Sequence, residues 1–531
     1  MHTRWRDDGG DRLTIRVRAA TLDKYPAKSH ARRVAEQLAV GRGVIVLAAA
    51  PSALYPDSDQ PVVLRQDRYF YYLSGCNEPD CYVTYDIARD ILGLWVPAID
   101  KRRVVWSGRG STVEEALARY DIDEAYYIEP TCNGEKKGRD GPQGAPILDN
   151  VLSHGTDGEH IYAMVGAATC RARTNESVRP AQERELKLQR GLDACRVIKD
   201  EHEISLIRRA NEITAEAHRA VLYGLHGFIS EAEVEAEYMR VCISRHAREQ
   251  AYSPIVGSGP NASVLHYVNN DEDLDDRQMM VLDAGCEVSC YASDVTRGIP
   301  LNKRNPGTWP SEEAEEVYRL VEKVQEACIS EMRPGKSFVE IARMAYDMTL
   351  DGLLDFGILQ GDRMAIKEAR THLGFFPHGL GHHLGLEVHD VAPPALPPKS
   401  SSSTTRLSHS DIPHLPPMFD FAPSSLYSAE TASNAGSAAK QDGSHLRPGM
   451  VVTVEPGVYF NDYLLSNFYL NDPKHAKFIN VKVLENYMPV GGVRIEDDIL
   501  ITRDGYENLT TAPKGDAMLR CIRKGAESGR A

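Results

Sequence analysis

The sequence lacks the long apolar runs, the basic surplus and the paired cysteines that mark three large classes of protein. In 531 residues, no stretch approaches the roughly 20 apolar residues that a membrane span requires. The segment Met1–Asp11 is polar and charged and has no apolar core of a secretory signal. We therefore expect a cytoplasmic protein without a membrane partner.

Acidic residues outnumber basic ones: the chain has 76 Asp and Glu and 61 Lys and Arg, which gives a formal net charge of -15. Binding to nucleic acid needs a basic footprint, so the composition predicts no such partner. The ten cysteines include no CxxC pair, and Cys286 and Cys290 have no second pair to complete a thiolate zinc site. The length allows two or more domains with a large core.

The first part of the chain has short β-rich runs that alternate with turns and helical segments. Gly43–Leu47 and Tyr69–Leu73 are predicted to be buried strands because they are rich in β-branched and aromatic residues. Arg173–Leu192 is polar and compatible with a helix that connects two domains. We predict an N-terminal domain at residues 14–185.

A second domain is predicted at residues 195–515. Asp200 and Glu203 have the spacing of a capping box in front of an amphipathic helix, and Ser337 and Glu340 repeat that signature. Helices mixed with strands without regular alternation predict the α+β class. The strand-like runs are Met279–Ala284, Tyr291–Ile299, Met450–Glu455 and Val493–Ile501.

One segment of the second domain, residues 392–445, is rich in proline, serine and alanine. Such a composition buries too little apolar surface to offset chain entropy. We predict a mostly disordered surface insertion.

Asp283 and Asp294 are separated by ten residues. If the chain reverses with Val288 and Ser289 at the tip, the two carboxylates lie opposite each other across a hairpin, about 5 Å apart. Their repulsion is relieved by a bound cation or by protonation of one of them. The alternative is a pair of ordinary turn or strand-end aspartates.

Four histidines lie within the twelve residues from His378 to His389. Gly379, Gly381 and Gly385 would cost a helix about 1 kcal/mol each, so the segment is predicted to be a loop. A single histidine is usually structural, whereas this density favours a ligand or proton-transfer site.

Two more carboxylates follow strand-like runs. Pro456 leaves Glu455 at the end of one strand, and Arg494 and Glu496 share one face of another. The candidate metal ligands are therefore Asp283, Asp294, His382, Glu455 and Glu496. Four carboxylates neutralise two divalent cations, and oxygen ligands with one nitrogen favour manganese, cobalt, iron or zinc. Two such ions can hold a bridging hydroxide and polarise a carbonyl.

These residues resemble those of the pita-bread metallopeptidases, in which the ligands follow the order Asp, Asp, His, Glu, Glu. The segments HGLGHHLGLEVHD, SDVTR and VRIEDD are similar to those of the proline-specific branch, Xaa-Pro aminopeptidase and prolidase. The segment Tyr71–Pro79 resembles the signature of a creatinase-type domain. The resemblance implies a pita-bread α+β catalytic domain after a creatinase-type α/β domain, with two divalent ions, Mn²⁺ foremost and Co²⁺ or Zn²⁺ as alternatives.

The resemblance also implies roles for the five ligands. Asp294 and Glu496 would bridge both ions, Asp283 would complete one of them, and His382 and Glu455 the other. Glu455 would also carry the proton of the attacking water to the leaving proline nitrogen.

Four further residues match catalytic positions of the family. His266 would contact the scissile region, and His389 would steady the tetrahedral intermediate. His378 and Arg494 would orient the substrate or the ligands.

The activity implied is that of an Xaa-Pro aminopeptidase, which hydrolyses the bond between an N-terminal residue and a penultimate proline. The expected partners are peptides with proline in second position and a second copy in a homodimer. The alternatives are a prolidase limited to Xaa-Pro dipeptides and a non-enzymatic pita-bread binding protein. Prolidases of the related eukaryotic type carry a dipeptide-binding arginine where this chain has Gln441, which favours the aminopeptidase.

Overall fold

The computed structural model describes residues 24–101, 104–128, 161–164, 178–392 and 445–528. The predicted insertion at residues 392–445 lies outside the described residues, apart from its two end positions. The domain bounds 14–185 and 195–515 stay predictions.

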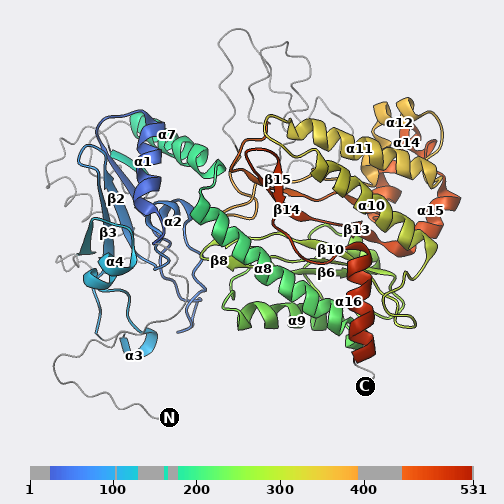
Figure 1. Cartoon of the computed structure of the whole chain (residues 1–531), viewed down its shortest axis with the longest axis horizontal. Helices are drawn as coiled ribbons and strands as arrows, with labels where there is room; N and C mark the ends of the chain where they lie inside the picture. The colour runs from blue at the N-terminus through green and yellow to red at the C-terminus, as the bar shows by residue number, and fades with distance from the viewer. Residues whose placement is uncertain (1–23, 102–103, 129–160, 165–177, 393–444, 529–531) are drawn as a thin grey trace, which may run out of the picture.

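The N-terminal half is built on a five-stranded mixed sheet in the order β4-β3-β2-β1-β5. The outer pairs β3–β4 and β1–β5 are parallel and the inner pairs antiparallel. The strands are β1 (Val44–Ala48), β2 (Tyr82–Asp86), β3 (Ile91–Pro97), β4 (Glu124–Ile128) and β5 (Ile161–Met164). The helices are α1 (Ala27–Leu38), α2 (Arg68–Ser74), α3 (Val104–Ser107) and α4 (Val113–Arg119), seen on the left of Figure 1.

Of the two strands predicted in this half, one is confirmed and one is wrong. Gly43–Leu47 overlaps β1 from Val44 to Leu47, but Tyr69–Leu73 lies in helix α2. The side chain of Asp67 accepts a hydrogen bond from the amide of Phe70, and Gly75 closes the helix at φ 63°. These two caps outweigh the β-propensity of the aromatic run between them.

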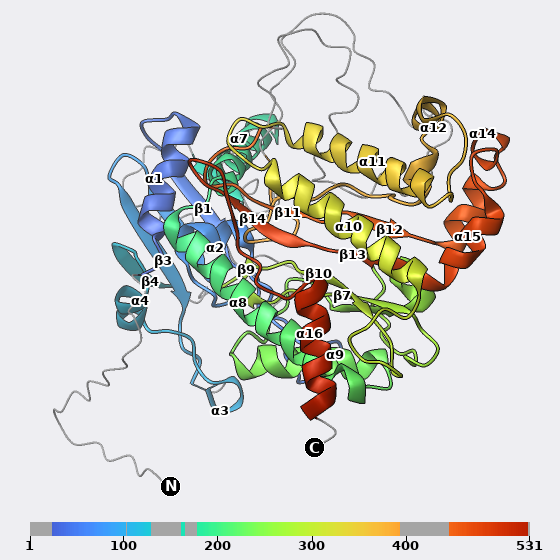
Figure 2. The ribbon, with the colours of Figure 1, turned by 45° about the vertical axis from the view of Figure 1, so that its right-hand side comes forward.

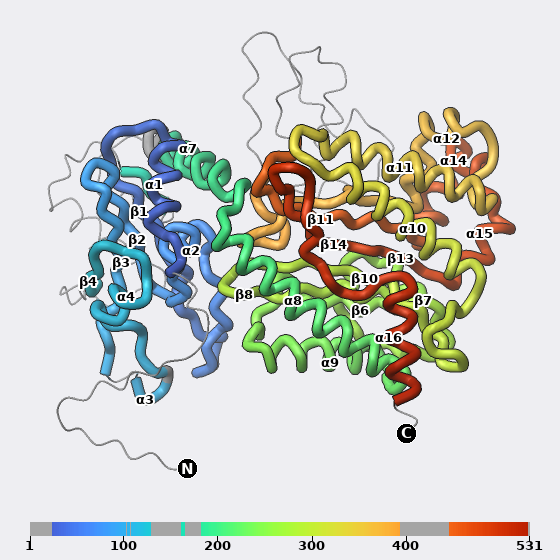
Figure 3. Tube along the Cα trace, viewed as in Figure 1, coloured from blue at the N-terminus to red at the C-terminus, as the bar shows by residue number. Residues whose placement is uncertain are grey.

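Two helices join the halves: α7 (Val178–Val197) and α8 (Glu201–Gly224) (Figures 1 and 3). The helix predicted within Arg173–Leu192 is confirmed from Val178 on and runs to Val197, while residues 173–177 lie outside the described residues. The capping box of Asp200 and Glu203 is present with both reciprocal hydrogen bonds. Ser337 precedes a helix as predicted, but its side chain makes no capping hydrogen bond.

The C-terminal half combines small sheets with long helices that lie across them (Figure 2). The strand orders are β10-β7-β6, β11-β14-β15, β12-β13 and β8-β9. The strands are β6 (Ile255–Ser258), β7 (Met279–Asp283), β8 (Glu287–Val288), β9 (Tyr291–Ala292), β10 (Thr296–Pro300), β11 (Val451–Val454), β12 (Gly457–Tyr459), β13 (Gly492–Arg494), β14 (Asp497–Ile501) and β15 (Tyr506–Asn508). The mixture of helices and strands confirms the α+β class.

The helices of this half are α9 (Glu231–Ser244), α10 (Glu312–Ser330), α11 (Phe338–Asp355), α12 (Arg363–Ala369), α13 (Asp462–Leu464), α14 (Pro473–Ala476), α15 (Val481–Tyr487) and α16 (Gly515–Ser528). Within the described ranges, none of the helices combines the length and the apolar character that crossing a bilayer would need.

Two main hydrophobic cores lie within the described part of the chain. The larger one packs α8, α10 and α11 onto the strands of the C-terminal half. The second core crosses the junction, since it joins Phe70 and Leu73 of α2 to Tyr291, Leu384 and Leu386 of the C-terminal half. The two halves are therefore packed together by apolar surface.

The hairpin that carries the two aspartates has a different register from the predicted one. Asp283 is paired with Thr296 rather than with Asp294. The turn residues are Ser289 and Cys290, both with positive φ, so the tip is shifted along the chain. Asp294 thus lies diagonally across from Asp283 on the same face.

We predict that Asp200→Ala lowers the free energy of unfolding more than the loss of a comparable N-cap elsewhere in the chain. Loss of an N-cap costs about 1 kcal/mol, and Asp200 also pairs with the buried His30, with 2.8 Å between Oδ2 and Nε2. Asp362, the exposed N-cap of α12, is the matched control. Urea unfolding should give a larger loss of stability for Asp200→Ala than for Asp362→Ala; equal losses would contradict the prediction.

Candidate metal centre

Asp283 and Asp294 are brought together beneath one tyrosine. Asp283 ends β7, and Asp294 lies between β9 and β10. The hydroxyl of Tyr252 is 2.5 Å from Oδ1 of each aspartate. A hydroxyl has one proton, so it donates to one carboxylate at a time, and the two acids remain in close, repulsive contact.

His382 reaches the site from a loop that runs along β11. The Thr453 amide donates to the His382 carbonyl at 2.9 Å, and the His382 amide donates to Thr453 Oγ1 at 3.0 Å. A Cβ added at Gly381 would lie 2.1 Å from the Thr453 carbonyl oxygen, so this close approach requires glycine. Nδ1 of His382 bonds the carbonyl of His383 at 3.0 Å, and its Nε2 lies 3.3 Å from Asp294 Oδ2 and 3.4 Å from Glu455 Oε1.

Glu496 completes the cluster from the segment between β13 and β14. Its Oε2 accepts a hydrogen bond from Thr296 Oγ1 at 2.6 Å. Ligand atoms of Asp294, His382 and Glu496 all lie within 4.8 Å of one another, and all three residues are buried. Two residues earlier, Arg494 donates to Asp283 Oδ2 at 2.6 Å.

The charges of this cluster are only partly balanced by the protein. Burial, followed by the charges of Asp294, Glu455 and Asp283, raises the pKa of Glu496 well above its usual range. Burial also raises the pKa of Asp294, and it raises that of Glu455 to about 7. Burial alone would lower the pKa of His382, but the hydrogen bond to Asp294 and the Glu455 charge raise it to about 9.

This donor set fits divalent cations. The four carboxylates and one imidazole converge in one site. Of the four carboxylates, Asp283 is the one that pairs with the guanidinium of Arg494. Burying so many acids without compensation is costly, and oxygen donors with one nitrogen suit Mn²⁺, Co²⁺ or Zn²⁺. The structure therefore gathers all five residues that were predicted as ligands.

The three other predicted histidines border the same site. His378 Nε2 lies 2.8 Å from the Tyr459 hydroxyl, which in turn accepts from Arg494 at 2.9 Å. The ring of His389 contacts that of His382, with 4.1 Å between centroids. Burial, then Arg494, and more weakly His266 lower the pKa of His378 to about 3. His266 and His389 are both exposed, so they face incoming ligands.

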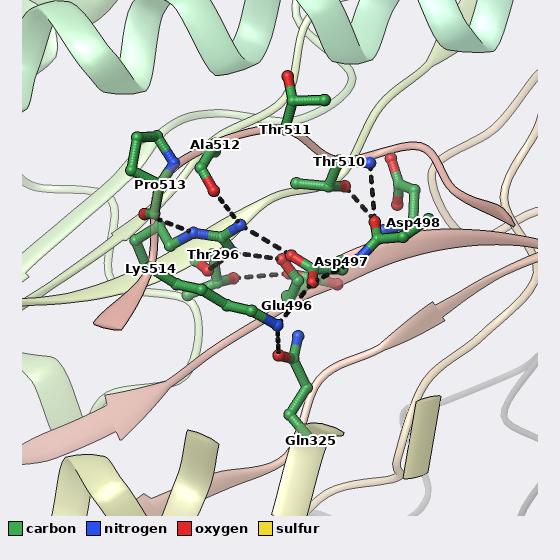
Figure 4. A network of polar contacts seen from close by, with 12 residues as sticks. Thr296, Gln325, Glu496, Asp497, Asp498, Thr510, Thr511, Ala512, Pro513 and Lys514 are labelled. Carbon is green, nitrogen blue, oxygen red and sulfur yellow. Dashed lines mark hydrogen bonds and ion pairs between the residues drawn. The ribbon is translucent and has the colours of Figure 1, made fainter. Parts of the chain in front are cut away.

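A buried ionic layer supports the site from behind (Figure 4). Arg297 donates to the carbonyls of Thr296 and Glu496 at 2.8 and 2.7 Å and pairs with Asp497 at 2.8 Å. Lys514 lies 3.1 Å from the other oxygen of Asp497. This layer fixes β10 to the segment that carries Glu496.

Sequence reasoning missed several polar residues that hold the ligands. Tyr252 and Tyr459 lie in no pattern that predicts a role. Thr296 lies within the SDVTR segment, and Thr453 shares a strand face with Glu455, so strand alternation could have indicated both.

A buried acidic cluster with one imidazole, carried by small sheets under long helices, fits a metal-dependent enzyme. The chain belongs to metallopeptidase family M24, whose model matches residues 205–503, and the model of the aminopeptidase P N-terminal domain matches residues 28–132. The predicted family and the predicted two-part architecture are thereby confirmed.

Individual relatives agree with this assignment. A probable Xaa-Pro aminopeptidase of Pyrenophora tritici-repentis is 48% identical over 98% of this chain and 74% of the relative. One of Aspergillus clavatus is 46% identical over 97% of this chain and 96% of the relative. The solved structure of E. coli aminopeptidase P in its low-pH form gives a TM-score of 0.68 at 25% identity, over 94% of this chain and 99% of that one.

We predict that Mn²⁺ raises the melting temperature of the metal-free protein, because it removes the repulsion between the carboxylates. At a concentration of 100 times Kd the gain is about 2.7 kcal/mol. Without metal, Asp294→Asn should melt higher than the wild type, since it removes one repelling charge, and it should lose most of the response to Mn²⁺. The exposed Asp271→Asn is the control. Calorimetry with and without a chelator measures all three proteins, and an unchanged wild type in Mn²⁺ would refute the site.

Proposed function

We propose that this protein is an Xaa-Pro aminopeptidase that releases the residue in front of a penultimate proline. The observation that carries the proposal is the convergence of Asp294, His382 and Glu496 within 4.8 Å, with Glu455 3.4 Å from the imidazole. Relatives named probable Xaa-Pro aminopeptidases share this chain almost end to end, which supports the same activity here.

The cofactor of the proposal is a pair of divalent ions, Mn²⁺ foremost. The donor set supports it, because four carboxylates balance two such ions and the single imidazole adds one nitrogen ligand. Asp283, Asp294, His382, Glu455 and Glu496 would hold the ions. When bound, they supply an activated water and polarise the scissile carbonyl.

Glu455 is suited to move the proton in this reaction. Its side chain is 17% exposed, so it reaches the open side of the site, and Thr453 Oγ1 holds its Oε1 at 3.2 Å. In the proposal its carboxylate takes the proton of the attacking water and delivers it to the leaving nitrogen. A prolyl amide nitrogen has no hydrogen, so it needs this proton on departure.

The histidines supply the remaining contacts. His266 and His389 are exposed, one near His378 and the other against His382, and they can donate to substrate carbonyls, including the oxygen that becomes negative in the transition state. The Tyr459 hydroxyl holds His378, whose ring also contacts that of Phe376, which favours a role in orienting the proline ring. A cytoplasmic location and a homodimeric assembly stay predictions.

The proposal is tested by hydrolysis of an Xaa-Pro-Xaa tripeptide with Mn²⁺-loaded protein. We expect release of the first residue, loss of activity with a chelator, and recovery when Mn²⁺ is restored. Asp294→Ala should abolish hydrolysis, because it removes a shared ligand, while circular dichroism shows an unchanged fold. Asp271→Ala is the control and should retain activity. Full activity of Asp294→Ala would refute the assignment of the site.

A matched dipeptide separates the proposal from the prolidase alternative. We expect kcat/KM to be higher for the tripeptide, since the position of the dipeptide-binding arginine is taken by Gln441, which lies outside the described residues. Steady-state kinetics on both peptides, followed by detection of the free N-terminal residue, gives the ratio. A preference for the dipeptide would favour prolidase.

A further inference from the structure

The histidine loop, which we define as His382–Asp390, is anchored next to His389 by a fully buried carboxylate. Asp390 is 1% exposed and accepts hydrogen bonds from Arg196 Nη2 at 2.6 Å and Lys199 Nζ at 3.0 Å. Both cations are buried as well, and both lie where α7 passes into α8. A buried carboxylate with two buried cations has one defined position.

A second carboxylate of the histidine loop is held by the N-terminal half. Glu387, two residues before His389, pairs with Arg65 Nη2 at 2.7 Å and with Arg68 Nε at 3.4 Å. Arg68 also binds the buried Glu287 at 2.6 Å, so its guanidinium is already oriented. The loop is thus held by charge on both sides of His389.

Apolar contacts place the same loop against the same half. Leu384 and Leu386 are 0% and 1% exposed, and they belong to the core that contains Phe70 and Leu73 of α2. The backbone amide of Leu384 donates to Val451 on β11 at 3.0 Å. The histidine loop therefore lies between β11 and the N-terminal half.

Arg196 is itself tied to α2. Its guanidinium lies over the ring of Tyr69 at 4.8 Å, and the Tyr69 hydroxyl donates to Asp193 at 2.8 Å. A displacement of α2 would therefore be transmitted through Arg196 to Asp390.

His389 depends on these anchors for its position. Its side chain is exposed, and its ring contact with His382 is the one aromatic contact that the described residues give it. An exposed side chain loses rotamer freedom when it is fixed, so a rigid backbone on both sides reduces the cost of placing it at the substrate.

We propose that the N-terminal half and the α7–α8 junction position His389 for catalysis through the carboxylates of Glu387 and Asp390. The cations that hold these carboxylates are Arg65, Arg68, Arg196 and Lys199. Glu387 and Asp390 act as positioning residues, since neither reaches the candidate ligand atoms. This inference rests on the proposed function, because it concerns the efficiency of the same site.

The test is a double-mutant cycle on the full-length, Mn²⁺-loaded protein with the tripeptide as substrate. Asp390→Asn keeps the shape of the side chain and removes its charge, and it should lower kcat/KM by about 10- to 100-fold. In the His389→Ala background the same change should cause little further loss, because the group that it positions is gone. If Asp390→Asn lowers kcat/KM by the same factor in the wild type and in His389→Ala, the inference is wrong.

Glu203→Gln is the matched control at the junction. Glu203 is 1% exposed, and its carboxylate accepts from the Tyr291 hydroxyl and from the Asp200 amide, both at 2.9 Å, so it binds the start of α8 and not a carboxylate of the histidine loop. Whatever loss it causes should be the same with and without His389. If the effect of Glu203→Gln also disappears in the His389→Ala background, as expected for Asp390→Asn, the coupling is a general effect of the junction and the specific role of Asp390 is wrong.

Metal content separates an effect on His389 from an effect on His382. Asp390→Asn should retain the bound manganese of the wild type, and loss of manganese would mean that the anchor acts through His382 instead. If Asp390→Asn does not fold, Glu387→Gln takes its place in the cycle, because Glu387 is 38% exposed and tolerates the change, with an expected loss of a few-fold.

The wild type and His389→Ala distinguish the two proposals. If the wild type does not hydrolyse the tripeptide, the proposed function is wrong. Normal hydrolysis by the wild type together with undiminished activity of His389→Ala overturns this inference and leaves the proposed function intact.

Discussion

The mutual repulsion of four clustered carboxylates, three of them buried, is the constraint on which the rest of the structure depends. Acids that repel each other stay together only if their backbones cannot separate. Asp283, Asp294, Glu455 and Glu496 come from four different segments, so local structure alone cannot restrain them. The restraint comes from the layer behind them, where Arg297 binds the carbonyls of Thr296 and Glu496 and pairs with Asp497.

The two halves of the chain contribute unequally to this site. The C-terminal half carries all five candidate ligands, whereas the N-terminal half contributes cations and apolar surface to the histidine loop. A domain without ligands can thus affect a reaction by restricting the freedom of a loop that carries functional groups. Such coupling needs packed surfaces and defined ion pairs, and both are present at this junction.

Much of the fold and the site could be predicted from the sequence, for identifiable physical reasons. Asp200 and Glu203 predicted the start of α8 because a capping box is a local interaction. The spacing of Asp283 and Asp294 predicted their proximity, but the register was wrong, since two positive-φ residues at the turn moved the tip. Tyr69–Leu73 was predicted to be a strand from its aromatic content, whereas the caps that make it a helix, Asp67 and Gly75, lie outside that run.

The residues that could not be predicted act at long range. Tyr252 contacts aspartates 31 and 42 positions later, and no local pattern marks a hydroxyl that contacts two acids. Arg196 and Asp390 are 194 positions apart, and their pairing depends on how the halves pack. Periodicity and capping describe segments, whereas these contacts depend on the three-dimensional arrangement of segments.

The hydrogen bond from His382 to the carbonyl of His383 fixes the chemistry of that imidazole. A carbonyl oxygen only accepts, so Nδ1 must carry the hydrogen, and the neutral ring has the tautomer whose free lone pair is on Nε2. In the neutral ring that a cation would bind, Nε2 faces Asp294 and Glu455, which would be ligands together with it. Once it is engaged in coordination, the ring has no site left to accept a proton, so His382 cannot shuttle protons during turnover.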